Sequence, residues 1–293
     1  MAVTSADFLL TGVTGQVGFE LARTLSTLGS IWAPTRTELD LMDPVAVAAA
    51  VRACQPRWIV NAAAYTAVDK AETERALSQR LNTALPGELA GLARELGCGL
   101  VHFSTDYVFA GEGEQAYRES DPCQPLNAYG ADKHAGEQAI LASGAAALIF
   151  RTSWVYGSRG RNFMLTMLRL AAERPELAVV ADQIGAPTWS RQIAEAVAQV
   201  LAQVSPAALG ERSGVYHLVN GGETSWYGFA SAILSQSGYT TPVRPIASHD
   251  FPAPARRPAN SRLSCNKLAE TFGVRLPDWR YGLQLCLQER GSA

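Results

Sequence analysis

Short apolar runs alternate with helix-forming stretches through the first half of the chain, and this alternation constrains the fold more than any other feature. The runs lie at Phe8–Leu10, Ile31–Trp32, Trp58–Val60, Gly99–Phe103 and Ala147–Phe150. Ala-rich segments of helical length separate several of them. Strands joined by right-handed helical crossovers form a parallel sheet with helices on both faces. We therefore predict an α/β protein whose ligands bind at the carboxyl ends of its strands.

Three glycines follow the first predicted strand, where a helix is expected to begin. The segment reads TGVTGQVG from Thr11 to Gly18. Glycine allows close approach of a pyrophosphate, and a helix N-terminus offers free N–H groups and partial positive charge. The spacing is GxxGxxG instead of GxGxxG, so a purely structural turn is the alternative. The position after the first strand favours a Rossmann-type doubly wound sheet that binds a dinucleotide. The predicted contacts are Gly12, Thr14, Gly15, Gln16 and Val17.

Beyond about residue 157 the regular alternation ends, and connections that contain Pro, Gly and Ser become frequent. This part predicts a smaller C-terminal substrate domain. A helix at Trp189–Val204 and a strand at Val215–Val219 can still return to the first sheet. We therefore expect a dinucleotide-binding domain at 1–157, with parts of 176–219 returning to its sheet, and a domain at 158–293 that mainly binds substrate.

The segment after the second strand bears on the choice between NADPH and NADH. An arginine there can pair with a 2′-phosphate, whereas a carboxylate binds the 2′-hydroxyl. Arg36 favours NADPH, with a solvated surface arginine as the alternative, and Glu38 or Asp40 can instead face the ribose or adenine. Small residues after the third strand suit either a flat cofactor or tight packing of a helix on the sheet. The candidates in these two segments are Arg36, Asp40, Leu41, Ala62, Ala63 and Ala64.

Tyr129 and Lys133 stand four residues apart in a predicted helix, so their side chains share one face. A nearby ammonium favours the phenolate and lowers a tyrosine pKa from about 10, which brings it into range for proton exchange with a carbonyl oxygen. Thr105 ends the fourth strand, where its hydroxyl can converge on the same oxygen. These three residues are the predicted catalytic group, and Tyr129 and Lys133 are also expected to contact the cofactor.

Together these motifs resemble the short-chain dehydrogenase/reductase superfamily in its extended form, which acts on nucleotide sugars. Longer segments narrow the resemblance to the dTDP-4-dehydrorhamnose reductase family. They are NAAAYTAVDKAE (61–72), STDYVF (104–109), RTSWVYG (151–157), DQIGAPT (182–188) and RPANSRL (257–263). They occur in order along most of the chain and are long enough to be specific.

The resemblance implies reduction of the C4 ketone of dTDP-4-dehydro-6-deoxy-L-mannose to dTDP-L-rhamnose, with hydride from NADPH or NADH. Tyr129 is then the proton donor, Lys133 tunes it and contacts the nicotinamide ribose, and Thr105 bonds the reacting oxygen. The implied substrate contacts are Val68, Ser104, Asp106, Tyr107, Trp154 and Arg257.

Some of these implied contacts have alternatives. Trp154 can be a core residue, because tryptophans are highly buried on average. Arg257 shares the pyrophosphate assignment with its neighbour Arg256, and a surface arginine in a Pro-rich loop is the alternative for both. Asp69 and Glu72, which also lie in the matching segments, can serve a helix N-terminus.

Two other kinds of protein share parts of this pattern. An epimerase or 4,6-dehydratase uses the same Tyr/Lys pair, but a dehydratase typically has Asp-Glu after the strand-four Ser/Thr, where this chain has Asp106 and Tyr107. A non-catalytic regulatory subunit can keep the fold and bind NADP(H). Retention of Tyr129, Lys133 and Thr105 argues against that second alternative.

One position departs from the family pattern. Some members form a dimer with Mg²⁺ held by interface glutamates, and Glu20 matches one of them. Arg191 stands at the other position, where the metal requires a carboxylate. The four histidines show no metal-ligand spacing. We therefore expect no metal and a monomer or weak homodimer.

Charge and cysteine usage exclude several other partners. Twenty-five Lys and Arg against 27 Asp and Glu leave no basic surplus for nucleic acid. No uninterrupted apolar stretch approaches the roughly 20 residues that span a bilayer, and the N-terminus lacks the basic region of a signal peptide. The five cysteines are far apart and never form CxxC. These features predict a cytoplasmic protein with no membrane partner.

Overall fold

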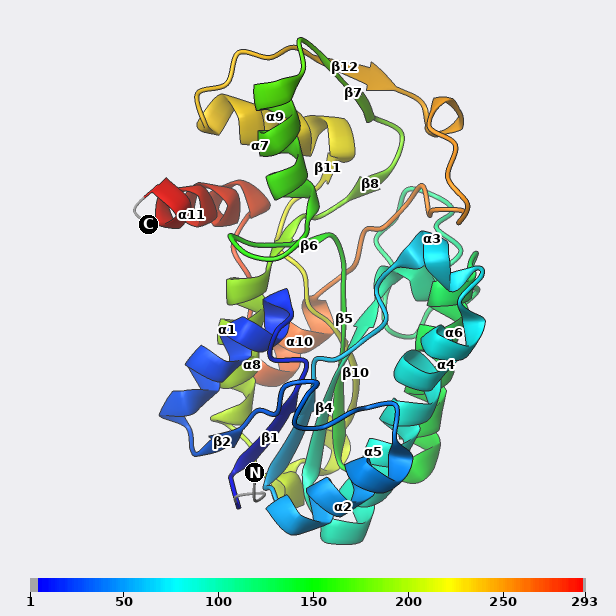
Figure 1. The fold of residues 1–293 in the computed structure, drawn as a ribbon, viewed down its shortest axis with the longest axis vertical. Helices are drawn as coiled ribbons and strands as arrows, with labels where there is room; N and C mark the ends of the chain where they lie inside the picture. The colour runs from blue at the N-terminus through cyan, green and yellow to red at the C-terminus, as the bar shows by residue number, and fades with distance from the viewer. Residues whose placement is uncertain (1–4, 292–293) are drawn as a thin grey trace.

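The computed structural model describes residues 5–291 and is built on a six-stranded parallel sheet (Figure 1). Its strands are β1 (Phe8–Thr11), β2 (Ile31–Trp32), β3 (Trp58–Asn61), β4 (Gly99–Thr105), β5 (Ala147–Thr152) and β10 (Gly214–His217). Their order is β10-β5-β4-β3-β1-β2, and every neighbouring pair is parallel. The order reverses between β1 and β3, which is where doubly wound sheets bind their ligands. The predicted Rossmann-type α/β fold is confirmed.

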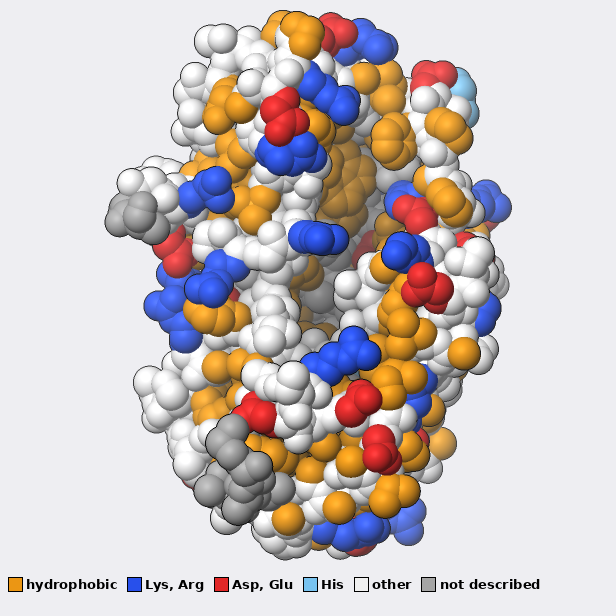
Figure 2. Space-filling model, in the orientation of Figure 1, with side chains coloured by type: hydrophobic (Ala, Val, Ile, Leu, Met, Phe, Trp, Pro, Cys, Tyr) orange, Lys and Arg blue, Asp and Glu red, His pale blue; other side chains and the backbone are white. Residues whose placement is uncertain are grey.

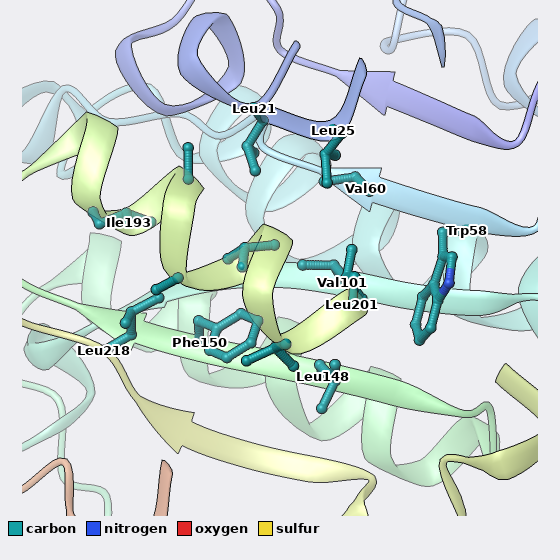
Figure 3. Packing of buried hydrophobic residues seen from close by; sticks show 14 of the residues in the cluster. Leu21, Leu25, Trp58, Val60, Val101, Leu148, Phe150, Ile193, Leu201 and Leu218 are labelled. Atoms are coloured by element: carbon teal, nitrogen blue, oxygen red, sulfur yellow. The ribbon is translucent and has the colours of Figure 1, made fainter. Parts of the chain in front are cut away.

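Helices cover both faces of this sheet. One face carries α1 (Gln16–Thr24), α8 (Ser190–Leu201) and α10 (Asn266–Phe272), and the other carries α2 (Pro44–Cys54), α5 (Leu85–Leu96) and α6 (Ala128–Ser143). Because side chains alternate along a strand, Val60 and Val101 pack toward α1 and α8, while Ile59 and Leu100 pack toward α2 and α5. Figure 3 shows the first of these two cores. Burial of both faces explains the continuous apolar runs in the strands.

A second part of the molecule lies beyond the carboxyl ends of the strands (Figure 1). It contains α7 (Phe163–Glu173), α9 (Trp226–Gln236), α11 (Trp279–Gly291), β7 (Leu177–Val180) and β12 (Val243–Ile246). Its core is separate from the two sheet cores and centres on residues such as Met164, Phe229 and Trp279. The chain therefore crosses between the two parts more than once. After α7 and β7 of the second part, α8 packs on the first sheet and β10 adds a strand to it.

Short elements complete the described chain. The strand pairs are β6 (Val155–Tyr156) with β9 (Thr188–Trp189) and β8 (Ile184–Gly185) with β11 (Thr224–Ser225). The short helices are η1 (Leu25–Thr27), α3 (Val68–Ala71), α4 (Arg75–Gln79), the π-helical η2 (Arg80–Ala84), η3 (Asp106–Val108), η4 (Pro206–Ala208), η5 (Gly210–Arg212) and η6 (Ser248–Asp250). Within residues 5–291, no helix combines the length and the apolar character needed to cross a bilayer.

Candidate active site

A cavity of about 960 Å³ lies at the carboxyl ends of β1, β3, β4 and β5. Figure 2 shows the hollow between the two parts of the molecule, with Lys and Arg side chains near its edge. Its lining includes every predicted site residue except Arg257: Gly12, Thr14, Gly15, Gln16, Val17, Arg36, Asp40, Leu41, Ala62, Ala63, Ala64, Val68, Ser104, Thr105, Asp106, Tyr107, Tyr129, Lys133 and Trp154. The fold thus brings the connections that follow β1, β2, β3, β4 and β5, together with helix α6, to one place.

The glycine segment forms the turn between β1 and α1. Gly12 has φ +76°, and a Cβ on it would lie 2.6 Å from the Ala62 carbonyl carbon. A Cβ on Gly18 would collide with the Gly12 carbonyl. The turn itself therefore requires these two glycines. Gly15 precedes α1, which has neither a side-chain cap nor an acidic residue in its first turn. Free N–H groups beside the cavity fit the pyrophosphate of a dinucleotide.

The residues after β2 divide into two groups. Glu38 accepts hydrogen bonds from the Thr35 N–H and hydroxyl, both at 2.8 Å, so it closes a turn instead of lining the cavity. Arg36 and Asp40 both line the cavity and are exposed. Within residues 5–291, Arg36 forms no hydrogen bond or ion pair. Of the groups considered for the cofactor ribose, the arginine is thus available and Glu38 is not.

Tyr129 is positioned by the way α6 begins. The Asn127 side chain caps the helix by accepting from the Gly130 N–H at 2.8 Å. A Cβ on Gly130 would collide with the Tyr107 carbonyl, so the first turn of α6 packs directly on the residues that follow β4. This close approach places the Tyr129 phenol beside the Thr105 side chain, whose hydroxyl lowers the pKa of the phenol. Helix and strand end therefore meet at the two predicted catalytic hydroxyls.

The predicted effect of Lys133 on Tyr129 is wrong. Burial raises the pKa of Tyr129 to about 12, and the negative charge of Asp106 acts in the same direction, while the neighbouring Thr105 hydroxyl opposes them. The Lys133 ammonium is directed elsewhere, since it donates to the Phe103 carbonyl at 2.6 Å. Loss of water around the phenol outweighs any help from the lysine. The result is a phenol that keeps its proton at neutral pH.

Asp106 adds a second titratable group next to this phenol. Burial raises the pKa of its carboxyl to about 6, although hydrogen bonds with Ser261 and Thr105 act against that rise. The Thr105 hydroxyl donates to Asp106 Oδ1 at 3.1 Å and accepts from the Tyr107 N–H at 3.2 Å. Above about pH 6 the charged carboxylate disfavours a phenolate at Tyr129 and so helps to retain the proton.

Trp154 follows β5 in a strained conformation. Its φ is +49°, in the left-handed region, where a bulky residue costs about 1–3 kcal/mol. The half-buried indole stacks on Trp226 with ring centroids 3.7 Å apart and planes 12° apart, and both rings line the cavity. Trp154 is therefore part of the cavity wall and not a fully buried core residue.

Arg257 lies outside the cavity lining. Its Nη2 donates to Asp69 Oδ2 at 2.8 Å, and Asp69 also accepts from the Ala255 N–H at 3.2 Å. Arg257 contacts the side chain of Tyr107, which does line the cavity. Asp69 therefore fixes the arginine loop, and it also lies in the first turn of α3, where a negative charge is favourable. Glu72 does serve a helix start, because its Oε1 accepts from the N–H of Ala128 in α6 at 2.9 Å.

Comparison with known proteins places the chain in a family. The family model described as RmlD substrate binding domain matches residues 6–291. A dTDP-4-dehydrorhamnose reductase of Burkholderia thailandensis is 48% identical over 292 residues, which cover 96% of this chain and 98% of that protein. The chain belongs to the dTDP-4-dehydrorhamnose reductase family. The reductase of Escherichia coli K12 is 43% identical over 295 residues and 97% of each chain.

Solved structures of the same reductase family have the same fold. One from Clostridium acetobutylicum has a TM-score of 0.91 at 34% identity, covering 96% of this chain and 98% of that one. One from Bacillus anthracis, in complex with NADP, has a TM-score of 0.90 at 35% identity and covers 98% and 100%. A UDP-glucose 4-epimerase of Thermus thermophilus is 20% identical with a TM-score of 0.80, which shows a shared fold alone.

Arg191, the residue that departs from the reductase family pattern, forms its ion pairs within one chain. Arg191 Nε donates to Glu20 at 3.2 Å, and its Nη2 donates to Glu289 at 2.6 Å. Glu20 is buried, with 4% of its surface exposed. Since the arginine neutralises Glu20 inside the protein, this carboxylate is not free to serve as a metal ligand.

Three potential metal ligands lie close together elsewhere in this reductase family member, but an arginine is hydrogen-bonded to two of them. Ligand atoms of Cys123, His134 and Glu137 lie within 4.8 Å of one another. Arg151 donates to Glu137 Oε2 at 2.6 Å and to Cys123 Sγ at 3.2 Å. A fixed cation among these groups repels a metal ion, so we assign no metal to them.

Trp226 and Arg161 are two of the cavity residues that were not predicted. Trp226 begins α9, more than seventy positions beyond Trp154, and no local pattern links the two indoles. Arg161 lies in the connection between β6 and α7, where its exposed cation lines the cavity near the glycine turn. The Asn162 side chain holds this connection by donating to Gln16 Oε1 at 2.8 Å. Only the folded contact between distant segments reveals either residue.

Proposed function

We propose that this protein reduces the C4 ketone of dTDP-4-dehydro-6-deoxy-L-mannose to dTDP-L-rhamnose, with NADPH as the preferred cofactor and NADH as a possible one. The observation that carries the proposal is the placement of the Tyr129 phenol beside the Thr105 hydroxyl in the cavity of a reductase family member. The NADP complex of the Bacillus anthracis relative supports the cofactor. The uncapped start of α1 supports it independently.

Catalysis in this proposal depends on proton delivery by Tyr129. NADPH, when bound, supplies the hydride that reduces C4. The Tyr129 hydroxyl donates its proton to the C4 oxygen. The Thr105 hydroxyl, which donates to Asp106 Oδ1 in the structure, would turn to donate a second hydrogen bond that fixes this oxygen. A phenol pKa of about 12 keeps the proton in place until negative charge develops on the oxygen. Lys133 holds a positive charge behind the phenol and contacts the cofactor ribose.

The remaining predicted contacts are assigned by their place in the cavity. The cofactor group comprises Gly12, Thr14, Gly15, Gln16, Val17, Arg36, Asp40, Leu41, Ala62, Ala63 and Ala64. The sugar group comprises Val68, Ser104, Asp106, Tyr107 and Trp154, with Arg257 near the substrate pyrophosphate. Arg257 would have to exchange part of its bond with Asp69 for the phosphate. We assign cofactor binding to 1–157 with parts of 176–219, and sugar binding mainly to 158–293.

A stoichiometric assay separates this proposal from its alternatives. Enzyme, NADPH and the dTDP-4-keto sugar are mixed, and the loss of NADPH is compared with the alcohol formed. The reductase consumes one NADPH for each ketone reduced. An epimerase or dehydratase regenerates its cofactor and consumes none, and a regulatory subunit binds NADPH without turnover. Trials with GDP-linked and other dTDP-linked 4-keto sugars define the substrate.

Arg36→Ala should raise the KM for NADPH by about tenfold or more and leave the KM for NADH nearly unchanged. A hydrogen bond to a charged group contributes about 1.5–3 kcal/mol, and NADH has no 2′-phosphate to lose one. Steady-state kinetics with both cofactors make the measurement. Arg52→Ala, which removes an exposed arginine paired with Glu95, is the matched control. Equal changes in the KM values for NADPH and NADH would show that Arg36 does not contact the 2′-phosphate.

We also propose a monomer or weak homodimer whose activity survives EDTA. Arg191 already pairs with Glu20 and Glu289 in its own chain, so a metal bridge would lack its ligands. Sedimentation velocity at micromolar protein, with and without EDTA, is the measurement. A stable dimer that dissociates only on chelation contradicts the proposal. The five free cysteines support a reducing cytoplasm as the place of action.

A further inference from the structure

A chain of buried polar side chains connects Lys133 with Thr11 across the central strands, and both of these end residues line the cavity. Lys133 Nζ lies 3.1 Å from His102 Nε2. His102 Nδ1 lies 3.1 Å from Asn61 Nδ2, and the Thr11 hydroxyl donates to Asn61 Oδ1 at 2.7 Å. Thr11, Asn61 and His102 are register partners on the adjacent strands β1, β3 and β4. All four side chains are at most 1% exposed, so each polar atom depends on its neighbour in the chain.

The charges around this chain keep the imidazole neutral. Burial and the positive charge of Lys133 hold the pKa of His102 well below its usual range, although Glu137 opposes them. Burial lowers the pKa of Lys133 to about 8, again against Glu137. Glu137 is itself paired with Arg151 from β5. His102 therefore carries one ring proton, whereas Lys133 can hold or lose its proton close to neutral pH.

The chain can satisfy Lys133 in either charge state. When Lys133 is an ammonium, His102 Nε2 accepts from it, and the Nδ1–H donates to the Asn61 amide oxygen, which a half-turn of the amide brings to that side. When Lys133 is neutral, the His102 Nε2–H donates to Lys133 Nζ, and His102 Nδ1 accepts from the Asn61 amide N–H. The Thr11 hydroxyl then donates to Asn61 Oδ1, as the structure has it. The Asn61 amide transfers no proton in this exchange. It presents either its N–H group or its oxygen to His102, depending on which way it is turned.

We propose that His102, supported by Asn61 and Thr11, is a positioning residue that keeps Lys133 Nζ hydrogen-bonded at the same place in both of its charge states. The Phe103 carbonyl accepts from Lys133 at 2.6 Å in either charge state, but the lone pair of the neutral amine needs a donor, which His102 supplies. The inference rests on the proposed function, because the position of Lys133 matters for catalysis only if the protein is the proposed reductase. It adds a residue that does not itself touch substrate or cofactor.

The direct test follows the ring of His102 in the wild-type protein without ligand. The chain has four histidines and three lysines, so ¹⁵N-labelled imidazoles and lysine side chains give few NMR signals, assigned with His102→Gln and Lys133→Met. We expect His102 to carry its proton on Nδ1 at low pH and on Nε2 at high pH, with a midpoint equal to that of Lys133, near pH 8. A single tautomer throughout the titration of Lys133 would overturn the proposal.

A matched pair of variants tests which ring atom matters. The amide of His102→Gln reaches the place of Nε2 and can still accept from Lys133, whereas that of His102→Asn reaches only the place of Nδ1. We expect the Asn variant to lower the Lys133 midpoint by about one pH unit, because the ammonium loses an acceptor, and the Gln variant to keep it. The alkaline limb of the kcat–pH profile should move in parallel. Equal behaviour of the two folded variants would overturn the proposal.

A control separates the contact from the general loss of a buried histidine. His217 is also fully buried, but its ring lies against Phe109 and outside the cavity lining. His217→Asn should leave the Lys133 midpoint unchanged, and an equal shift in this variant would contradict the proposal. If the wild type fails to reduce the 4-keto sugar, the proposed function falls, while the ligand-free titration still decides the role of His102.

Discussion

Replacing Tyr129 with Phe should lower kcat about 10²- to 10⁴-fold, which is the usual contribution of a positioned general acid. The phenol keeps its proton because burial and Asp106 raise its pKa to about 12, so it can donate only to an oxygen that gains negative charge during the reaction. Phenylalanine preserves the ring and its edge-on contact with Tyr107. The dissociation constant of NADPH, measured by fluorescence titration, should therefore change little.

Tyr156→Phe is the matched control for that substitution. Tyr156 is fully buried outside the cavity, and within residues 5–291 its hydroxyl has no hydrogen-bond partner. Removal of this hydroxyl should leave kcat at the wild-type value. If Tyr129→Phe turned over as fast as Tyr156→Phe, the proton would have to come from another group, and Thr105 or Asp106 would be the next to replace.

The sheet could be predicted from the sequence because strands and helices are local patterns. The apolar runs are continuous where both faces of the sheet are covered. One of the Ala-rich segments between them forms α2, which Asp43 caps and Pro44 begins. Tyr129 and Lys133 could be paired for the same reason, since four residues make one helical turn. Residues that act together within one element are visible before the fold is known.

The rest of the site depends on contacts between distant segments. Arg257 was expected at the substrate, but its position is set by Asp69, which lies 188 residues earlier in the chain. The direction of the Tyr129 pKa was mispredicted because spacing gives the distance to Lys133 and says nothing of the water lost around the phenol. His102 looked like an ordinary histidine because its partner Asn61 lies on another strand. Such residues become visible only when the strands are in register.

Arg151→Met should destabilise the protein by about 3–5 kcal/mol at pH 7, because it leaves Glu137 as a buried carboxylate without its partner. The two side chains are almost wholly buried and form two hydrogen bonds, Nε to Oε1 at 2.8 Å and Nη2 to Oε2 at 2.6 Å. The pair joins α6 to β5 behind the catalytic helix face. Urea unfolding of the wild type and the variant gives the difference.

The difference in unfolding free energy between the wild type and Arg151→Met should depend on pH, because the pKa of Glu137 differs between the two proteins. Hydrogen bonds and the charge of Arg151 hold the pKa of Glu137 at about 2 against the opposing effect of burial, so in the wild type its contribution is complete above about pH 4.5 and is lost as the pH falls toward 2. In Arg151→Met the contacts with His134 and Ser104 remain, but burial is the largest effect and raises that pKa, so protonation of Glu137 relieves the variant. The stability difference should therefore shrink as the pH is lowered from 7 to 4.

Two further variants decide whether the unpaired charge is the cause. Adding Glu137→Leu to Arg151→Met removes the stranded carboxylate and should recover most of the lost stability, since apolar replacement of a whole buried pair is often neutral or better. Arg169→Ala breaks an exposed pair with Glu173 and should cost no more than about 0.5 kcal/mol. If the double variant were no more stable than Arg151→Met, the loss would come from packing against Phe109 and Cys123 instead of from charge.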